Sequence, residues 1–303
     1  MEEVRRMVFS STVFLFLFLP LVIMIYYNPF VKGRKFKNLF LLLSSLFFYA
    51  WGEPVYVFLM LISILVTWIL AFFLRGRYKK VVLTVGIVYH VGVLFIFKYL
   101  TFLISQLGLI LNQDFSYIKI ALPIGISFFT FQLMSYFLDV YKGEAKPQKN
   151  IFNLGLYVSL FPQLIAGPIV RYNEIEEQIN NRAESIENLS AGMKRFIYGL
   201  AKKLLLADYL SVIADSSFSR IGDQTVAMAW FGILAYSLQI YFDFSGYSDM
   251  AIGLGKMFGF EFAENFNYPY ISKSIVEFWR RWHISLSSWF RDYVYIFLGG
   301  KHE

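Results

Sequence analysis

Residues 241–300 have the sequence YFDFSGYSDMAIGLGKMFGFEFAENFNYPYISKSIVEFWRRWHISLSSWFRDYVYIFLGG. This stretch combines the apolar content of a membrane segment with many ionisable side chains. Aromatic residues surround the ionisable residues of its second half, which are Glu277, Arg280, Arg281, His283, Arg291 and Asp292. Because a charge in an apolar setting is costly, such residues in a membrane protein are candidates for function.

The aromatic spacing of this second half predicts a helix. Residues at the 3, 4 and 7 spacing of one helical face are Trp279, Trp282, His283, Leu286, Trp289, Phe290 and Tyr293. Glu277 lies one turn before Arg281, which is the favoured order for an ion pair on a helix. Such a helix suits the membrane–water boundary, with its aromatic face inward and its basic face toward phosphates.

His283 would then point with the aromatic residues toward the protein interior or a cavity. The alternative is a histidine that is merely hydrogen-bonded within the packing. Periodicity alone does not decide between these two interpretations.

The chain of 303 residues has the composition of a membrane protein. It is 57% hydrophobic, 20% aromatic and 16% charged, with a mean hydropathy of +0.54, whereas soluble domains are about a quarter charged. We therefore predict an all-α, polytopic integral membrane protein, with residues 1–303 in a single membrane domain. The net charge of +7 is interpreted as lysine and arginine in cytoplasmic loops, because the sequence holds no soluble module that would bind nucleic acid.

The residue types restrict the possible chemistry. The absence of cysteine excludes disulfides, cysteine–zinc sites, thiol nucleophiles and S-palmitoylation. Imidazole chemistry is restricted to His90, His283 and His302. Asp243 and Asp249 flank a serine but form no nucleophile elbow, and no spacing indicates a metal site. The glycines at 246, 253, 255 and 259 are predicted to permit close helix packing.

Apolar runs and basic loops predict a topology. The expected membrane segments are residues 7–27 (bent at Pro20), 39–51 (short, and extended by its flanks), 55–74, 81–111 (one crossing with an interfacial tail), 118–138 (kinked at Pro123) and 226–242. The basic loops at 32–37, 75–80 and 142–149 fall on one face, which the positive-inside rule makes cytoplasmic. On this count the N-terminus lies outside.

Three further segments lie between these spans. Residues 151–172 contain Pro162, Gly167 and Pro168, so we expect a re-entrant or broken segment near the working site, with a simple kinked span as the alternative. Residues 173–195 are predicted to be a surface helix and solvated linker. Residues 196–213 are predicted to be an amphipathic helix at the cytoplasmic boundary, with Lys202 and Lys203 snorkelling.

Four stretches resemble the membrane-bound O-acyltransferase family, in its bacterial branch of alginate O-acetylation and teichoic acid D-alanyl transfer proteins. They are the quoted stretch, VFSSTVFLFLFLP at 8–20, LPIGISFFTFQLMSYFLDVYKG at 122–143 and FPQLIAGPIVRY at 161–172. They occur in family order and extend over most of the chain. The resemblance implies tilted spans with re-entrant and interfacial helices around a thinned centre, where a cytoplasmic acyl donor meets an acceptor hydroxyl from outside.

The resemblance also implies site residues. It gives one histidine in the W-H-I-S-L-S motif, here His283, and a second in a downstream W-H-G segment, which is generally assigned as catalytic. The chain ends at GGKHE before such a segment, and His302 is not its equivalent, so we expect a C-terminal truncation with the main family histidine outside the chain.

His283 is then the candidate catalytic residue in an accessory or orienting role. The candidate substrate-binding residues are Arg280, Arg281, Arg291, Asp292, Trp279 and Trp282, with the arginines steering donor phosphates. Lipid-headgroup anchoring is the alternative for the arginines, and packing at the membrane interface is the alternative for the tryptophans.

The predicted function is O-acyl transfer, in particular of acetyl, to hydroxyls of an exported polysaccharide or cell-wall polymer. An acyl thioester or an equivalent donor would be the co-substrate, with no bound cofactor and no metal. The expected partners are membrane lipids, an acyl carrier protein, a soluble or extracellular acetyltransferase and the polysaccharide, with no nucleic acid. The expected location is the cytoplasmic (inner) membrane of a bacterium, as a multi-pass protein.

Two other functions stay open. One is a catalytically incomplete fragment or a membrane scaffold. The other is a polytopic transporter, which would predict paired ionisable residues in several spans and an inverted repeat. Neither of those two features is evident in the sequence.

Overall fold

The computed structural model of the chain describes residues 7–30, 33–115, 117–165, 167–219, 222 and 224–300. All secondary-structure elements in these residues are helical, which confirms the predicted all-α class. Within the same residues, three helices are long and apolar enough to cross a membrane, namely α3 (Tyr56–Phe73), α4 (Lys79–Lys98) and α12 (Val226–Met257). With 32 residues, α12 is about 48 Å long and exceeds the hydrocarbon thickness of a bilayer.

The chain groups into two compact units, and each is described by itself; one membrane domain stays a prediction. Besides α3 and α4, the first unit contains α2 (Arg34–Gly52), α5 (Leu100–Leu111), α6 (Ile126–Lys142), α7 (Ile151–Ser159), α8 (Phe161–Leu164) and most of α9 (Tyr172–Asn181). Besides α12, the second contains η2 (Phe14–Phe18), the start of α1 (Leu19–Tyr26), α10 (Ile186–Ala201), η3 (Lys202–Ala207), α11 (Asp208–Phe218), η5 (Pro269–Ile271), α13 (Ile275–Arg281), α14 (Ile284–Phe290) and η6 (Arg291–Tyr295).

Prolines and glycines set several helix boundaries. The π turn η2 ends at Phe18, two residues before Pro20, which has no N–H for the usual helical hydrogen bond. The predicted span over 118–138 is wrong in its first half, because α6 begins only at Ile126, after Pro123. Gly125 precedes α6 with a φ of 71°, and a Cβ there would lie 2.9 Å from the carbonyl oxygen of Leu164. This close approach and the left-handed backbone both require glycine.

Residues 151–165 confirm the predicted broken segment and contradict a simple kinked span. Helix α7 stops at Leu160, whose ψ is 111°, and the short α8 follows with Pro162 in its first turn. The backbone N–H of Phe161 at the break donates to the hydroxyl of Ser45 on α2, at 3.1 Å. Residues 154–164 are all buried, so protein surrounds this irregular backbone. Irregular backbone at membrane depth needs such cover, because hydrocarbon offers its N–H and C=O groups no hydrogen-bond partners.

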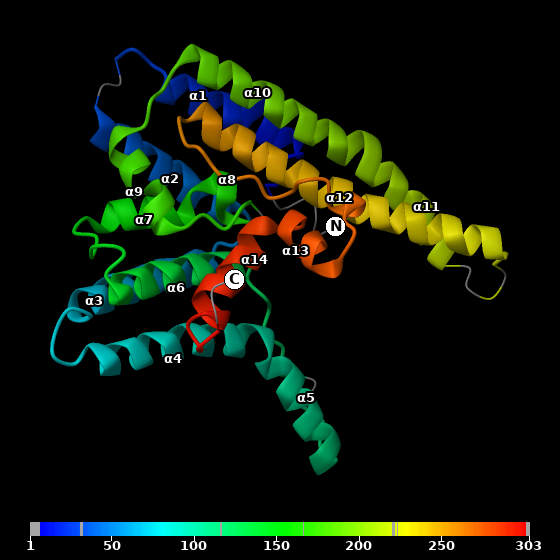
Figure 1. Cartoon of the computed structure of the whole chain (residues 1–303), viewed down its shortest axis with the longest axis horizontal. Coiled ribbons are helices and arrows are strands. Elements are labelled where there is room, and N and C mark those ends of the chain that lie inside the picture. Colours follow the sequence, from blue (N-terminus) through cyan, green and yellow to red (C-terminus); the bar gives the residue numbers. More distant parts are fainter. Residues whose placement is uncertain are drawn as a thin grey trace. The chain divides into compact units, whose positions relative to one another are not determined.

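Of two other predicted segments, one agrees with the structure and one does not. Residues 81–111 form α4, which is long enough to cross a membrane, and the shorter α5, which leaves α4 at an angle (Figure 1); this agrees with one crossing followed by a tail. The single surface helix predicted over 173–195 is wrong, because α9 and α10 are separate and the intervening Arg182 is buried. Its Nε donates to the carbonyl of Phe258 at 3.0 Å, and its guanidinium lies 4.4 Å from the ring centre of Phe260. A residue in a predicted solvated linker is therefore part of the core.

Helices α10 and α12 run side by side in the second unit (Figure 1). Two pairs of glycines bring their backbones into contact, Gly192 with Gly253 and Gly199 with Gly246. A Cβ on Gly192 would lie 2.5 Å from the carbonyl oxygen of Gly253, and a Cβ on Gly199 would lie 2.5 Å from that of Gly246. The predicted role of the glycines at 246 and 253 in close packing is confirmed.

A methyl group at this contact should destabilise the protein. In Gly253→Ala the new Cβ would lie 2.7 Å from the carbonyl oxygen of Gly192, and we expect a loss of about 1–3 kcal/mol from overpacking. Gly92→Ala in α4 is the matched control, because nothing lies within 4 Å of its Cβ position, and it should gain up to about 1 kcal/mol from helix propensity. Thermal unfolding in detergent measures both, and equal melting temperatures for the two variants would contradict the contact.

Candidate functional site

The predicted continuous helix through His283 is interrupted at that residue. Helix α13 ends at Arg281, Trp282 is extended, and His283 has a φ of 44° before α14 begins at Ile284. The prediction of one helix over this stretch is therefore wrong, and His283 instead lies at a sharp turn between two short helices.

Backbone hydrogen bonds from an extended segment explain the interruption. The N–H of Asn267 donates to the carbonyl of Arg281 at 2.9 Å, and the N–H of Ile284 donates to the carbonyl of Asn265 at 3.0 Å. These bonds satisfy backbone groups on both sides of His283 that a continuous helix would pair internally. Residues 265–267 thus stabilise the turn that presents the histidine.

The His283 ring is buried and hydrogen-bonded. Its Nδ1 lies 3.2 Å from Oδ1 of Asn265, and the same oxygen accepts hydrogen bonds from the backbone N–H of Ser285 at 3.1 Å and from its hydroxyl at 2.9 Å. The ring makes a T-shaped contact with Phe244 of α12, with 4.7 Å between ring centroids. The predicted inward orientation is confirmed for His283, Trp289 and Tyr293 but is wrong for Trp279 and Phe290, which are 51% and 46% exposed. The ring is hydrogen-bonded within the packing, as the alternative interpretation expects, and it is not among the residues that line the cavity described below.

Residues 167–170 reach the same site. The backbone N–H of Ile169 donates to the Ser285 hydroxyl at 3.0 Å, so this hydroxyl accepts one hydrogen bond and donates another to Asn265. The irregular segment after α8 therefore supports the His283 turn. It belongs to residues 151–172, which were predicted to lie near the working site.

Burial determines the protonation of His283. Only 8% of the residue is exposed, and this burial lowers the pKa of the imidazole from 6.5 to about 4. The ring is therefore neutral at physiological pH. A neutral imidazole can accept a proton or a hydrogen bond at one of its nitrogens.

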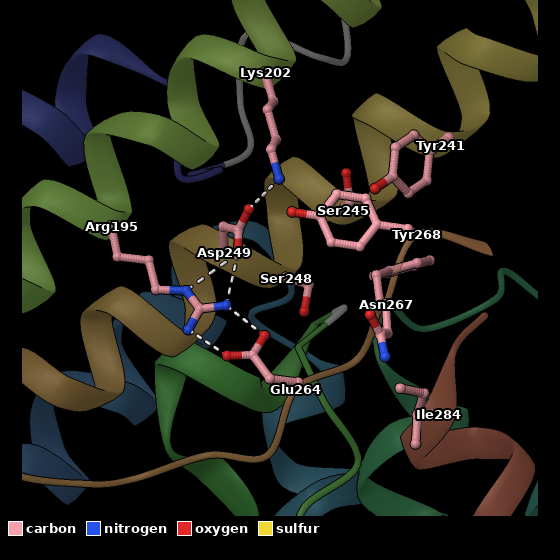
Figure 2. Close-up of a pocket in the computed structure, with 11 residues that line it drawn as sticks. Arg195, Lys202, Tyr241, Ser245, Ser248, Asp249, Glu264, Asn267, Tyr268 and Ile284 are labelled. Atoms are coloured by element: carbon pink, nitrogen blue, oxygen red, sulfur yellow. Dashed lines mark hydrogen bonds and ion pairs between the residues drawn. The ribbon is translucent and has the colours of Figure 1, made fainter. Parts of the chain in front are cut away.

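Four charged residues of the second unit form an ion-pair cluster, which is drawn in Figure 2. Arg195 donates from Nη2 to Asp249 at 2.8 Å and makes a two-point contact with Glu264, at 2.6 and 2.5 Å. Lys202 donates to the other oxygen of Asp249 at 2.5 Å. The cluster carries two cations and two carboxylates, so its formal charges cancel.

A cavity of about 520 Å³ borders this cluster. Besides the four charged residues, its lining consists of Tyr241, Ser245, Ser248, Phe266, Asn267, Tyr268 and Ile284. The buried hydroxyls of Ser245 and Ser248 have no hydrogen-bond partner among the described residues. Within residues 264–267, Glu264 binds Arg195, Asn265 binds His283, and Phe266 and Asn267 line the cavity. One short segment therefore links the ion-pair cluster, the cavity and the histidine.

The predicted substrate-binding residues divide into separate groups. Arg281 is bonded to Glu277 at 3.0 Å, as predicted, and also donates to the carbonyl of Asn267 at 3.1 Å. Trp282 packs edge-on against Phe266, with 5.1 Å between ring centroids. Both residues therefore lie beside His283. None of the six predicted substrate-binding residues is among those that line the cavity.

The other four predicted substrate-binding residues lie farther along the chain or on the surface. Arg280 is exposed, and Trp279 is 51% exposed. Arg291 pairs with the neighbouring Asp292 at 2.6 Å and is mostly exposed. His302, the third histidine, and Lys32 of the first basic loop lie outside the described residues. Within the described ranges, no group of three or more histidine, aspartate or glutamate residues could hold a metal ion.

Sequence reasoning missed the ion-pair cluster, and it missed Asn265 and Ser285. It assigned snorkelling to Lys202 and Lys203, which is wrong, because Lys202 pairs with Asp249 and Lys203 pairs with Asp243 at 2.7 Å. The available signal was the presence of two aspartates in an apolar helix together with two lysines in another apolar segment. Charges of opposite sign in such segments are expected to pair.

Proteins that are similar to this chain include O-acetyltransferases and a D-alanyltransferase. It is 47% identical over 97% of its residues to the probable alginate O-acetylase of Pseudomonas aeruginosa, and 37% identical over 97% to the peptidoglycan O-acetyltransferase of Helicobacter pylori. It is 32% identical over 57% of its residues to the teichoic acid D-alanyltransferase of Bacillus subtilis. The matches cover 58%, 62% and 45% of those proteins respectively, so the chain spans about three fifths of the length of the first two.

A family comparison gives the same result. The sequence profile of the membrane-bound O-acyltransferase family, MBOAT, matches residues 43–303. This range includes the ion-pair cluster, the cavity lining and His283.

The buried neutral imidazole should make stability depend on acidity. The unfolded chain has the ordinary histidine pKa of 6.5 and the folded chain a pKa of about 4 at His283, so protons bind preferentially to the unfolded state between these values. The stabilisation is complete above pH 6.5 and is lost as the pH falls toward 4, by about 1.4 kcal/mol per pH unit. Melting temperatures measured across this range in wild type and His283→Gln should diverge, with wild type losing more; parallel curves would contradict a depressed pKa.

Removing the shared carboxylate of the cluster should leave two cations with one partner. We expect Asp249→Asn to cost about 1–4 kcal/mol, because Lys202 and Arg195 are partly buried and lose a counter-charge. Asp208→Asn is the matched control, since its carboxylate is half exposed and contacts Lys203 at 3.3 Å, and it should cost at most about 1 kcal/mol. Chemical unfolding in detergent compares the two, and equal losses would contradict a specific role of Asp249.

Proposed function

Because the chain belongs to the membrane-bound O-acyltransferase family, we propose that it transfers an acyl group to hydroxyls of an exported polysaccharide or cell-wall polymer. We propose acetyl as the acyl group. The observation that supports this most is the 47% identity, over 97% of the chain, to a probable alginate O-acetylase. The second relative, a peptidoglycan O-acetyltransferase, supports a polymeric acceptor but not one particular polymer.

The reaction defines what the site has to do. The acceptor oxygen attacks the carbonyl carbon of an acyl thioester, a C–O bond forms, and the C–S bond breaks. The hydroxyl proton passes to a base, and the departing thiolate takes up a proton. A positioned imidazole is a common group for such proton transfer. The neutral ring of His283 suits it to orient the acceptor hydroxyl or to assist removal of its proton.

The donor and the partners follow from the same proposal. The donor is an acyl thioester, or an equivalent, delivered on the cytoplasmic side by an acyl carrier. Arg281 and Arg291 each hold a carboxylate, so Arg280, with no ion pair among the described residues, is the freest of the three to contact a donor phosphate. Membrane lipids surround the spans, and a soluble or extracellular acetyltransferase would complete delivery to the polymer.

The proposed location is the cytoplasmic membrane of a bacterium. Membership of a membrane-bound family and the three apolar helices support a multi-pass membrane protein. The basic loops around residues 75–80 and 142–149 support a cytoplasmic position of those loops under the positive-inside rule.

Substitution of His283 at the chromosomal locus tests the activity. His283→Ala should lower the acetyl content of surface polysaccharide by a factor of about 100 or more, because general acid–base catalysis contributes that much. Base-released acetate per unit of isolated polymer is the measurement. His90→Asn is the matched control, since His90 is buried in the first unit against Thr67 at 3.2 Å and away from the site residues in sequence, and it should retain acetylation.

Two results would count against the proposal. Unchanged acetyl content in a strain that lacks the gene would refute acyl transfer. A loss of polymer from the cell surface with unchanged acetyl per polymer would favour a transporter. Immunoblots of membranes must show equal amounts of each variant, so that loss of folded protein is not mistaken for loss of activity.

A further inference from the structure

The amide of Asn265 has a defined orientation, and this orientation has a consequence for His283. A backbone N–H can only donate a hydrogen bond. The N–H of Ser285 points at one end of the Asn265 amide at 3.1 Å, so that end is the carbonyl oxygen and not the NH₂ group. The Ser285 hydroxyl lies 2.9 Å from the same oxygen and donates to it, because a carbonyl oxygen can only accept, while the hydroxyl itself accepts from the N–H of Ile169.

The orientation of the amide fixes the tautomer of the imidazole. Nδ1 of His283 lies 3.2 Å from this same oxygen, and two acceptors cannot share a hydrogen bond, so Nδ1 carries the hydrogen. We infer that Asn265 is a positioning residue, which holds His283 as the Nδ1–H tautomer and leaves Nε2 as the atom that accepts a proton or hydrogen bond from the substrate. The role of Nε2 toward the substrate rests on the proposed acyl transfer, whereas the tautomer rests only on the hydrogen bonds of Asn265.

The uncharged amide suits a neutral base better than a carboxylate would. An aspartate at this position would favour the imidazolium and raise the pKa of the ring. The neighbouring charged residues are engaged elsewhere, since Glu264 binds Arg195 and Arg281 binds Glu277.

Among the described residues, no hydrogen bond, ion pair or ring contact joins the His283 ring to a titratable side chain. Phe244 of α12, Asn265 of the extended segment and Ser285 of α14 are the neighbours, and the 167–170 segment contributes a backbone N–H. Burial is accordingly the cause of the lowered pKa of His283.

Packing alone does not account for this asparagine. Asn265 is 1% exposed, and its NH₂ group has no hydrogen-bond partner among the described residues. A buried donor without a partner costs free energy. The oxygen, in contrast, accepts three hydrogen bonds. The residue is therefore arranged around its acceptor atom, which is the atom that orients His283.

Nitrogen NMR of the purified protein in detergent tests the tautomer directly. Long-range proton–nitrogen correlations distinguish Nδ1–H from Nε2–H, and the His283 signal is assigned by its loss in His283→Gln. Wild type should give the Nδ1–H pattern, and Asn265→Leu should shift the ring toward Nε2–H. An Nε2–H pattern in wild type would overturn the inference, whether or not the protein proves to transfer acyl groups.

The pH dependence of acyl transfer tests the positioning role. Asn265→Asp keeps an oxygen acceptor but adds a negative charge, so the acidic limb of the rate profile should move about 1–3 pH units higher, with activity recovered at alkaline pH. Asn265→Leu should lower the rate by a factor of 10 or more at every pH. Asn180→Asp is the matched control, because this asparagine is exposed on α9, and its profile should equal wild type.

Each outcome has one meaning. An unmoved acidic limb in folded Asn265→Asp would overturn the positioning role. If Asn265→Leu does not fold, the Asn265→Asp profile and the NMR of wild type still decide. Absence of acyl transfer in wild type together with an Nδ1–H signal would refute the proposed function and leave the tautomer assignment intact.

Discussion

The contact between α10 and α12 at two glycine pairs is the constraint on which the candidate site depends. Gly192 faces Gly253 and Gly199 faces Gly246, so the two helices run antiparallel with their backbones touching. Arg195 lies between the two glycines of α10, and Asp249 lies between the two glycines of α12. The charged pair is thereby held at 2.8 Å where the helices are closest, and side chains larger than hydrogen at the glycine positions would separate them.

The sequence was sufficient for the parts of the fold that depend on local properties. Composition predicted an all-α membrane protein, and Pro162, Gly167 and Pro168 predicted the broken segment, because proline and glycine act on the backbone where they stand. Glycines in an apolar helix predicted close packing. Their partners at 192 and 199 lie in or next to a stretch that was interpreted as a polar linker and an interfacial helix, so the sequence did not identify which helix they contact.

The errors have a common physical cause. Periodicity is local information, whereas the helix break at His283 is stabilised by backbone hydrogen bonds from residues 265–267, and the two lysines of η3 find aspartates on α12. Arg182 was placed in solvent for the same reason, since its partners Phe258 and Phe260 are distant in sequence. Nothing in a local pattern predicts such pairings, although opposite charges in two apolar segments give an indication.

The charge balance of the cluster and the neutrality of His283 have separate causes, although residues 264–267 connect the two places. Glu264 directly precedes Asn265, which binds His283, but the carboxylate of Glu264 is bound to Arg195. The two-point contact with Arg195 of α10 compensates the negative charge of Glu264. Burial, and not the charge of the cluster, lowers the pKa of His283. The imidazole is therefore neutral throughout the neutral pH range, whichever role it has in the proposed reaction.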